Sequence, residues 1–112
     1  MTEKAKKFLS DIFYSIELIQ EFTQDLDSFI DYKTDLKTKG AVERHLAIIG
    51  EAVNQFSKES TTIQLQNATQ IISLRNRLVH SYDTIDDAII WLILTRHLKP
   101  LKHEVEKTLS YK

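Results

Sequence analysis

Glycine and proline are scarce in this chain, which has two glycines and one proline among its 112 residues. A turn-rich sheet protein needs many of these residues, because tight turns require the backbone angles that they favour. Long helices need few of them. We therefore predict an all-α protein, a four- to five-helix up-and-down bundle that forms a single domain over residues 1–112.

Apolar residues at steps of three and four predict the first helices. They indicate a helix over about residues 3–23, then a short helix around residues 29–32 that is capped by Asp25 or Asp27. A third helix should end near Ser57. Small residues in that third helix should let another helix approach it closely. They are Ala47, Gly50 and Ala52.

The second half of the chain predicts two more helices. The first of them should begin around residues 65–67 and carry the segment 75–82. A break is expected at Asp83 and Thr84, either of which would cap a last helix. Pro100 should kink this last helix or end its main section, because proline lacks the backbone N–H that a helix interior uses.

Composition excludes several kinds of protein. Fifteen basic and sixteen acidic residues give a formal net charge of −1, so any RNA contact must come from a local patch. Without cysteine there is no disulfide, thiolate nucleophile or zinc-finger spacing. The longest apolar run, residues 88–94, is far shorter than the roughly 20 residues of a membrane span. We expect a soluble, cytoplasmic protein that uses no metal or cofactor.

Residues 75–82 place polar side chains where a helix should present its apolar face. At about 100° per residue, Arg75 and Tyr82 lie in the middle of the apolar sector of this helix. Asn76 and His80 are four residues apart and share the neighbouring sector. One ridge therefore carries a guanidinium, an amide, an imidazole and a phenol. These groups are sufficient to build a phosphate site.

This pattern resembles the HEPN superfamily, and specifically its HepT-like toxin branch. The resemblance is carried by Arg75 and Asn76, then three residues, His80, one residue and Tyr82. Residues 48–52 and 85–86 also look like that family, so the similarity covers nearly the whole chain. One departure is visible just before the motif helix, where relatives usually carry a proline and a tryptophan and this chain has residues 66–68, Gln-Asn-Ala.

The resemblance implies a fold and a function. The fold would be the HEPN bundle, and the protein would be the toxin of a type VII toxin–antitoxin system, a metal-independent endoribonuclease. An MNT-type nucleotidyltransferase antitoxin would silence it by transferring AMP to Tyr82. Carried onto this sequence, Arg75 and His80 are catalytic and Asn76 supports them. The implied partners are RNA and the antitoxin, with a higher hetero-oligomer as one form of their assembly.

The chemistry of the residues supports this reading independently. RNA is cut without metal when its own 2′-hydroxyl attacks the adjacent phosphate, which requires a base, an acid and charge stabilisation. His80 suits proton transfer, because the pKa of free histidine lies near 6.5. Arg75 offers a rigid fork of donors to the phosphate oxygens. Since the motif holds one histidine, a two-fold homodimer would supply both base and acid at a shared cleft.

Each of these residues also has a structural interpretation. Arg75 could pair with a buried acid such as Glu51. His80 could be an ordinary histidine on a helix surface, and Tyr82 a core or interface aromatic. His45 lies near the apolar face of the third helix, which favours a packing role.

Two charged groups of residues are open to similar alternatives. The last helix has a basic bias that could guide RNA or an acidic partner, or could be a solvated face. The residues concerned are Arg96, His97, Lys99, Lys102, His103 and Lys107. Asp83, Asp86 and Asp87 resemble a cation cluster, but acids at a helix start favour its positive dipole end without any metal.

A second functional class remains open. In it, the protein is a non-catalytic HEPN helical module that binds nucleotide or docks a nucleotidyltransferase partner. The complete set of Arg75, Asn76, His80 and Tyr82 favours the ribonuclease, because a docking module has no use for proton transfer and charge stabilisation together.

Overall fold

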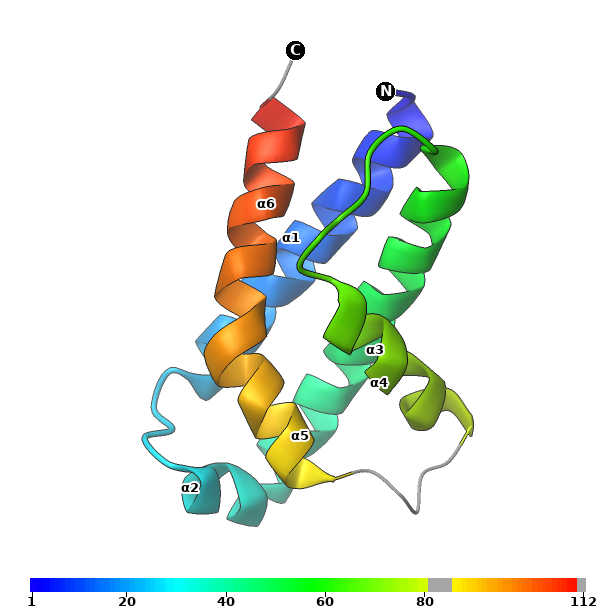
Figure 1. Ribbon diagram of the computed structural model, residues 1–112. Coiled ribbons are helices and arrows are strands. Elements are labelled where there is room, and N and C mark those ends of the chain that lie inside the picture. The colour runs from blue at the N-terminus through cyan, green and yellow to red at the C-terminus, as the bar shows by residue number, and fades with distance from the viewer. Residues whose placement is uncertain (81–85, 111–112) are drawn as a thin grey trace.

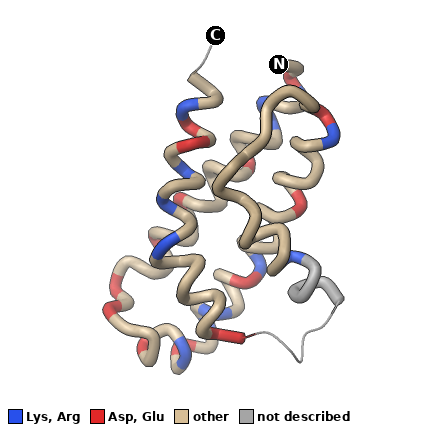
Figure 2. The backbone as a smooth tube through the Cα atoms, in the orientation of Figure 1, with Lys and Arg blue, Asp and Glu red and all other residues tan. Residues whose placement is uncertain are grey.

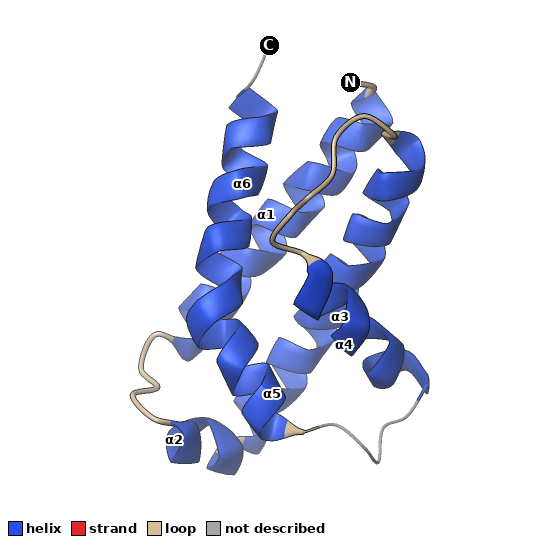
Figure 3. Ribbon diagram, viewed as in Figure 1, coloured by secondary structure: helices blue, strands red, loops and turns tan. Residues whose placement is uncertain are grey.

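The chain folds into helices joined by short connections (Figure 3). The computed structural model describes residues 1–80 and 86–110, and for residues 76–80 it describes the backbone alone. No strand occurs among these residues, which confirms the predicted all-α bundle. The elements in chain order are α1 (Glu3–Thr23), α2 (Phe29–Thr34), α3 (Leu36–Glu59), α4 (Thr69–His80), α5 (Asp87–Leu92), the π-helical η2 (Ile93–His97) and α6 (Leu98–Ser110).

The long helices alternate in direction, with α2 crossing one end of the bundle (Figure 1). Helix α1 packs against α3 and α6, and α4 packs against α3. Fully buried aliphatic side chains from α1, α3, α5, η2 and α6 meet in one core. They include Ile16, Ile49, Ile90, Ile93 and Leu101. No helix in the described part of the chain is long and apolar enough to cross a membrane.

The first helix lies where the sequence predicts it, but the N-cap of the second helix is a different residue from those predicted. Helix α1 covers Glu3–Thr23, as expected. The N-cap of α2 is Ser28, whose hydroxyl accepts a hydrogen bond from the Asp31 N–H, so the prediction of Asp25 or Asp27 is wrong. Serine satisfies a free N–H at a helix start as well as aspartate does. Asp27 uses its own N–H instead, which donates to the Asp31 carboxylate.

Helix α3 is longer at its end than predicted and is capped at its start by a carboxylate. It ends at Glu59, two residues beyond the expected Ser57. Asp35 accepts hydrogen bonds from both the N–H and the hydroxyl of Thr38, at 3.1 and 2.7 Å. These bonds stabilise the ionised carboxylate and lower the pKa of Asp35.

Helix α4 starts later than predicted, at Thr69 instead of residues 65–67. The physical reason is a competing acceptor on α6. The Glu104 carboxylate accepts the N–H groups of Gln66 and Asn67, at 2.7 and 3.0 Å, and the Asn67 side-chain amide at 3.1 Å. These bonds hold residues 66 and 67 against α6, and helix α4 begins two residues after them. The segment that precedes α4 crosses the bundle between α3 and α6 (Figure 1).

The last helix begins later than predicted, and of the two outcomes predicted at Pro100 the helix does not show an end. Its N-cap is Asp86, whose carboxylate accepts the Ala88 N–H at 2.9 Å, so neither Asp83 nor Thr84 caps it. Both of these residues lie outside the described part of the chain. Pro100 does not end the helix, which runs to Ser110. The π-helical η2 lies just before the proline, and the kink that the sequence offers as the other outcome stays a prediction.

Candidate functional site

Arg75 lies where α4 crosses α3. The glycine that faces it, Gly50, is buried in the middle of α3. A Cβ atom built on Gly50 would lie 2.6 Å from the Arg75 Cβ and 3.0 Å from its Cγ. Only glycine leaves room for this approach, which confirms the predicted role of Gly50 as a small residue at a helix contact. The stem of Arg75 is thereby seated directly on the backbone of α3.

The Arg75 guanidinium forms an ion pair with Glu51, the next residue of α3. The Nη2 atom of Arg75 donates to Oε2 of Glu51. Glu51 also accepts a hydrogen bond from the Gln55 amide at 2.9 Å. The Gln55 hydrogen bond, together with the bond and charge of Arg75, lowers the pKa of Glu51. Glu51 therefore stays ionised and keeps its hold on the guanidinium at neutral pH.

An ion pair between Arg75 and a buried Glu51 is the structural alternative that the sequence offers. The structure contains this ion pair, but it is not buried. The side chain of Glu51 is 48% exposed and that of Arg75 is 27% exposed. Pairs this open contribute about 0–1 kcal/mol to stability. The Nε atom of Arg75 is buried and makes no hydrogen bond to the described residues. The contact therefore orients the guanidinium, and of its donors only the terminal Nη groups can meet an anion, because Nε is buried.

The other three motif residues are placed less fully. Helix α4 runs through Asn76 to His80, so these two residues are four apart on one helical face, as predicted. His80 is about 7.5 Å further along the axis than Arg75 and about 140° around it, so the prediction that one ridge carries both side chains is wrong. The side chains of Asn76 and His80, and the whole of Tyr82, lie outside what the structure describes.

His45 and the acids after the motif have packing and capping roles. The ring of His45 lies 5.6 Å from that of Phe22 between centroids, and its Nδ1 is buried, which confirms a packing residue. Burial lowers the pKa of His45 and keeps the ring neutral. Asp86 caps α5, while Asp87 forms an ion pair of 2.7 Å with Lys39 of α3. Among the described residues, no group of acids or histidines is arranged to hold a metal ion.

Sequence reasoning missed Glu104, which fixes the approach to the motif helix. Its carboxylate takes the free N–H groups that precede α4. The sequence gives one weak indication that Glu104 has a special role, which is that it is an acid within the basic stretch of the last helix. A partner nearly forty residues away cannot be identified from local spacing.

The two glycines of α3 provide a matched test of the α3–α4 contact. Gly40 is exposed, and a Cβ built on it has no atom within 4 Å. We expect Gly40→Ala to raise the free energy of unfolding by about 0.5–1 kcal/mol, because alanine restricts the unfolded chain. Gly50→Ala gains the same term but must displace the stem of Arg75, and such overpacking costs about 1–3 kcal/mol.

Urea unfolding of the two variants measures the difference directly. Gly40→Ala should be more stable than the parent protein, and Gly50→Ala less stable. Equal stabilisation by both substitutions would contradict the close approach of α3 and α4.

Comparisons with known proteins assign this architecture to a family. The family model described as "Ribonuclease HepT-like" matches residues 12–108. A protein of Thermococcus cleftensis named "Probable ribonuclease HepT" is 35% identical over 111 residues, covering 96% of this chain and 97% of its own length.

Two proteins of Methanocaldococcus jannaschii, each named "Putative RNase", are also similar. One is 34% identical over 90% of this chain and 93% of its own length, and the other is 32% identical over 94% and 87%. No solved structure gave a significant match. The extent of the family match, together with the identity to these relatives, shows that the chain belongs to the HepT-like ribonuclease family of the HEPN superfamily.

Proposed function

We propose that this protein is a metal-independent endoribonuclease with Arg75 and His80 as its catalytic residues and Asn76 in support. The observation that carries the proposal is the way in which α3 positions the Arg75 side chain. A glycine in α3 admits its stem and Glu51 holds its guanidinium partly exposed, although an open ion pair of this kind stabilises the fold very little. The names of the relatives support an RNase activity.

The proposed reaction consumes no water and needs no cofactor. A base takes the proton from the ribose 2′-hydroxyl, and the 2′-oxygen attacks the adjacent phosphorus. The bond from phosphorus to the 5′-oxygen breaks, an acid protonates that oxygen, and the products end in a 2′,3′-cyclic phosphate and a 5′-hydroxyl. Arg75 donates to the phosphate oxygens as negative charge develops on them. His80 transfers a proton as base or acid.

We further propose that the active site is shared between two copies of the chain. One motif holds a single histidine, whereas the reaction uses a base and an acid on opposite sides of the phosphate. Within one copy, Arg75 and His80 are separated by about 140° around α4. Two copies related by a two-fold axis would bring each motif opposite its twin, so that one His80 serves as base and the other as acid.

The experiment that tests this function is cleavage of a mixed-sequence single-stranded RNA in excess EDTA. The protein should be purified without its antitoxin, and its mass should confirm that it is unmodified. We expect the RNA to be shortened in proportion to protein concentration. A folded, unmodified dimer that leaves the RNA intact would contradict the nuclease and favour a binding module.

The toxin role and its control by AMP belong to the same proposal. An MNT-type nucleotidyltransferase antitoxin would transfer AMP to Tyr82, two residues beyond His80, and block the cleft by bulk and negative charge. Tyr82→Phe should remain an active nuclease and become insensitive to the antitoxin with ATP. Mass spectrometry should find AMP on the parent protein and on Tyr14→Phe, a control at a tyrosine that is 62% exposed, but not on Tyr82→Phe. AMP on Tyr82→Phe would contradict the assignment.

A further inference from the structure

Four basic residues form a row along one face of the last helix. Arg96 lies in η2, and Lys99, His103 and Lys107 follow in α6 at steps of three and four. All four are exposed, and they fall within about 80° of one another around the helix. Figure 2 shows basic positions recurring along this element. The row is about 16 Å long, from the helical rise of its eleven steps.

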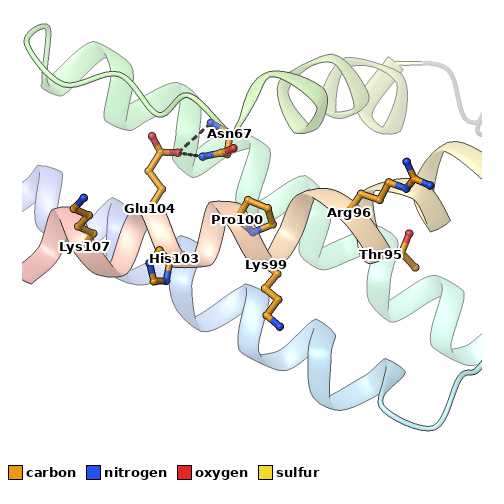
Figure 4. Close-up of a pocket in the computed structure, with 8 residues that line it drawn as sticks. All are labelled: Asn67, Thr95, Arg96, Lys99, Pro100, His103, Glu104 and Lys107. Carbon is orange, nitrogen blue, oxygen red and sulfur yellow. Dashed lines mark hydrogen bonds between the residues drawn. The ribbon is translucent and has the colours of Figure 1, made fainter.

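The row borders an open hollow of about 700 Å³ between the last helix and the segment that precedes α4. Figure 4 shows Arg96 and Lys107 at the two ends of the hollow, with Lys99 and His103 between them on the side towards α1. Asn67 forms the opposite wall. We call this feature the α6 groove.

Among the described residues that line the α6 groove there is one carboxylate, and its charge is already engaged. Glu104 accepts three N–H groups from Gln66 and Asn67, all between 2.7 and 3.1 Å (Figure 4). Lys102, in contrast, points away from the groove, because it donates to Gln20 of α1 at 3.0 Å and lies 5.3 Å from the Phe13 ring. Lys99 and His103 also line a smaller hollow on the side of α1, which they share with Lys102 and Glu106.

We infer that the α6 groove binds the backbone of a single-stranded RNA beside the proposed active site, an inference that rests on the proposed ribonuclease function. Cations at regular helical steps suit a chain that carries one phosphate per nucleotide, and the exposed His103 ring offers a surface on which a base can stack. The groove begins at Arg96 in η2, and η2 contacts the motif helix α4. A strand in the groove is therefore led towards the motif helix α4.

An acidic protein surface fits this groove less well than RNA does. Protein interfaces derive most of their affinity from a few large side chains buried in pockets. The lining residues of the groove are polar or charged except for Pro100, so they offer no such anchor. Because the net charge of the chain is close to zero, the protein as a whole does not attract a polyanion. A polyanion would therefore bind at a local row of basic residues such as this one.

Binding of a fluorescent 2′-O-methyl RNA tests the groove without depending on catalysis, because this RNA lacks the attacking hydroxyl. The test variant is Arg96→Gln, Lys99→Gln and Lys107→Gln combined. The control removes three other exposed positive charges, as Lys4→Gln, Lys33→Gln and Lys37→Gln combined. At about 0.7 per phosphate contact, the slope of log K against log salt should fall by about 2 in the test variant. Its Kd at 0.1 M salt should rise roughly 10- to 100-fold.

The outcomes separate this inference from the nuclease proposal. Weaker RNA binding in the test variant alone supports the groove, whether or not the parent protein cuts natural RNA. Equal RNA binding by the test variant and the parent protein overturns the groove and leaves the nuclease proposal standing. This holds even if the test variant binds polyglutamate, a probe for an acidic protein partner, more weakly than the parent does. An equal loss in the control variant also overturns it, because general charge would then be the cause.

Discussion

Replacing His80 by alanine is expected to lower the rate of RNA cleavage by about 10²–10⁴-fold, which is the usual contribution of a positioned acid or base. If two copies share the cleft, the substitution removes both proton-transfer groups at once, so the loss should fall at the upper end of this range. The measurement is the initial cleavage rate of a fluorescent RNA, followed as a function of pH. The steep dependence near neutral pH that a histidine produces should disappear with the side chain.

A matched histidine keeps this result interpretable. His97 lies in η2 and is not part of the motif, so His97→Ala should cut RNA at a rate close to that of the parent protein. Binding of 2′-O-methyl RNA by His80→Ala should change little, because the proposed role of His80 is proton transfer and not affinity. If His80→Ala cut RNA at the parent rate, the proposed mechanism would be wrong.

Replacing Arg75 by alanine should lower cleavage by about 10²–10³-fold, the usual cost of removing one donor that stabilises developing charge. Arg75→Lys should recover little of this loss. Lysine supplies a point charge and lacks the planar fork of donors that meets two oxygens at once. It also lacks the second nitrogen needed to keep Glu51 bound while contacting a phosphate. Full activity in Arg75→Lys would show that charge alone suffices and would contradict the orienting role of the α3–α4 contact.

Thermal unfolding and a Glu51 variant show whether Arg75 acts in catalysis or in the stability of the fold. The ion pair between Arg75 and Glu51 is open to solvent, so its loss should cost at most about 1 kcal/mol of stability. Glu51→Gln keeps an acceptor for the guanidinium, and we expect its cleavage rate to stay within about tenfold of the parent rate. A collapse in stability of Arg75→Ala would instead make Arg75 a residue of the fold.

The sequence predicts the helices well and their ends less well, for a physical reason. Periodic apolar residues report the face that enters the core, which is why α1 lies at the predicted residues. Helix starts depend on which acceptor reaches a free N–H group. Glu104 reaches Gln66 and Asn67 from α6, just before α4 begins, and no local pattern encodes that contact. The π-helical stretch before Pro100 likewise depends on packing that spacing does not record.

For the candidate site, the sequence predicts the residues and the structure shows the surroundings of one of them, Arg75. The motif spacing identifies Arg75, and the small residues of α3 indicate a close helix contact. That the two coincide, with Gly50 beneath the stem of Arg75 and Glu51 on its guanidinium, depends on how α4 crosses α3. The groove along α6 required the structure for a similar reason. The sequence lists its basic residues, but the structure separates Lys102, tied to α1, from those that face the hollow.

The chemical ends of the RNA products test the central claim most directly. RNA cut by the unmodified protein in excess EDTA should carry 2′,3′-cyclic phosphate at one new end and a 5′-hydroxyl at the other, as read by mass spectrometry of the fragments. These ends require attack by the RNA's own 2′-hydroxyl and so match the roles given to Arg75 and His80. Fragments with a 3′-hydroxyl and a 5′-phosphate, or cleavage that EDTA abolishes, would contradict the account.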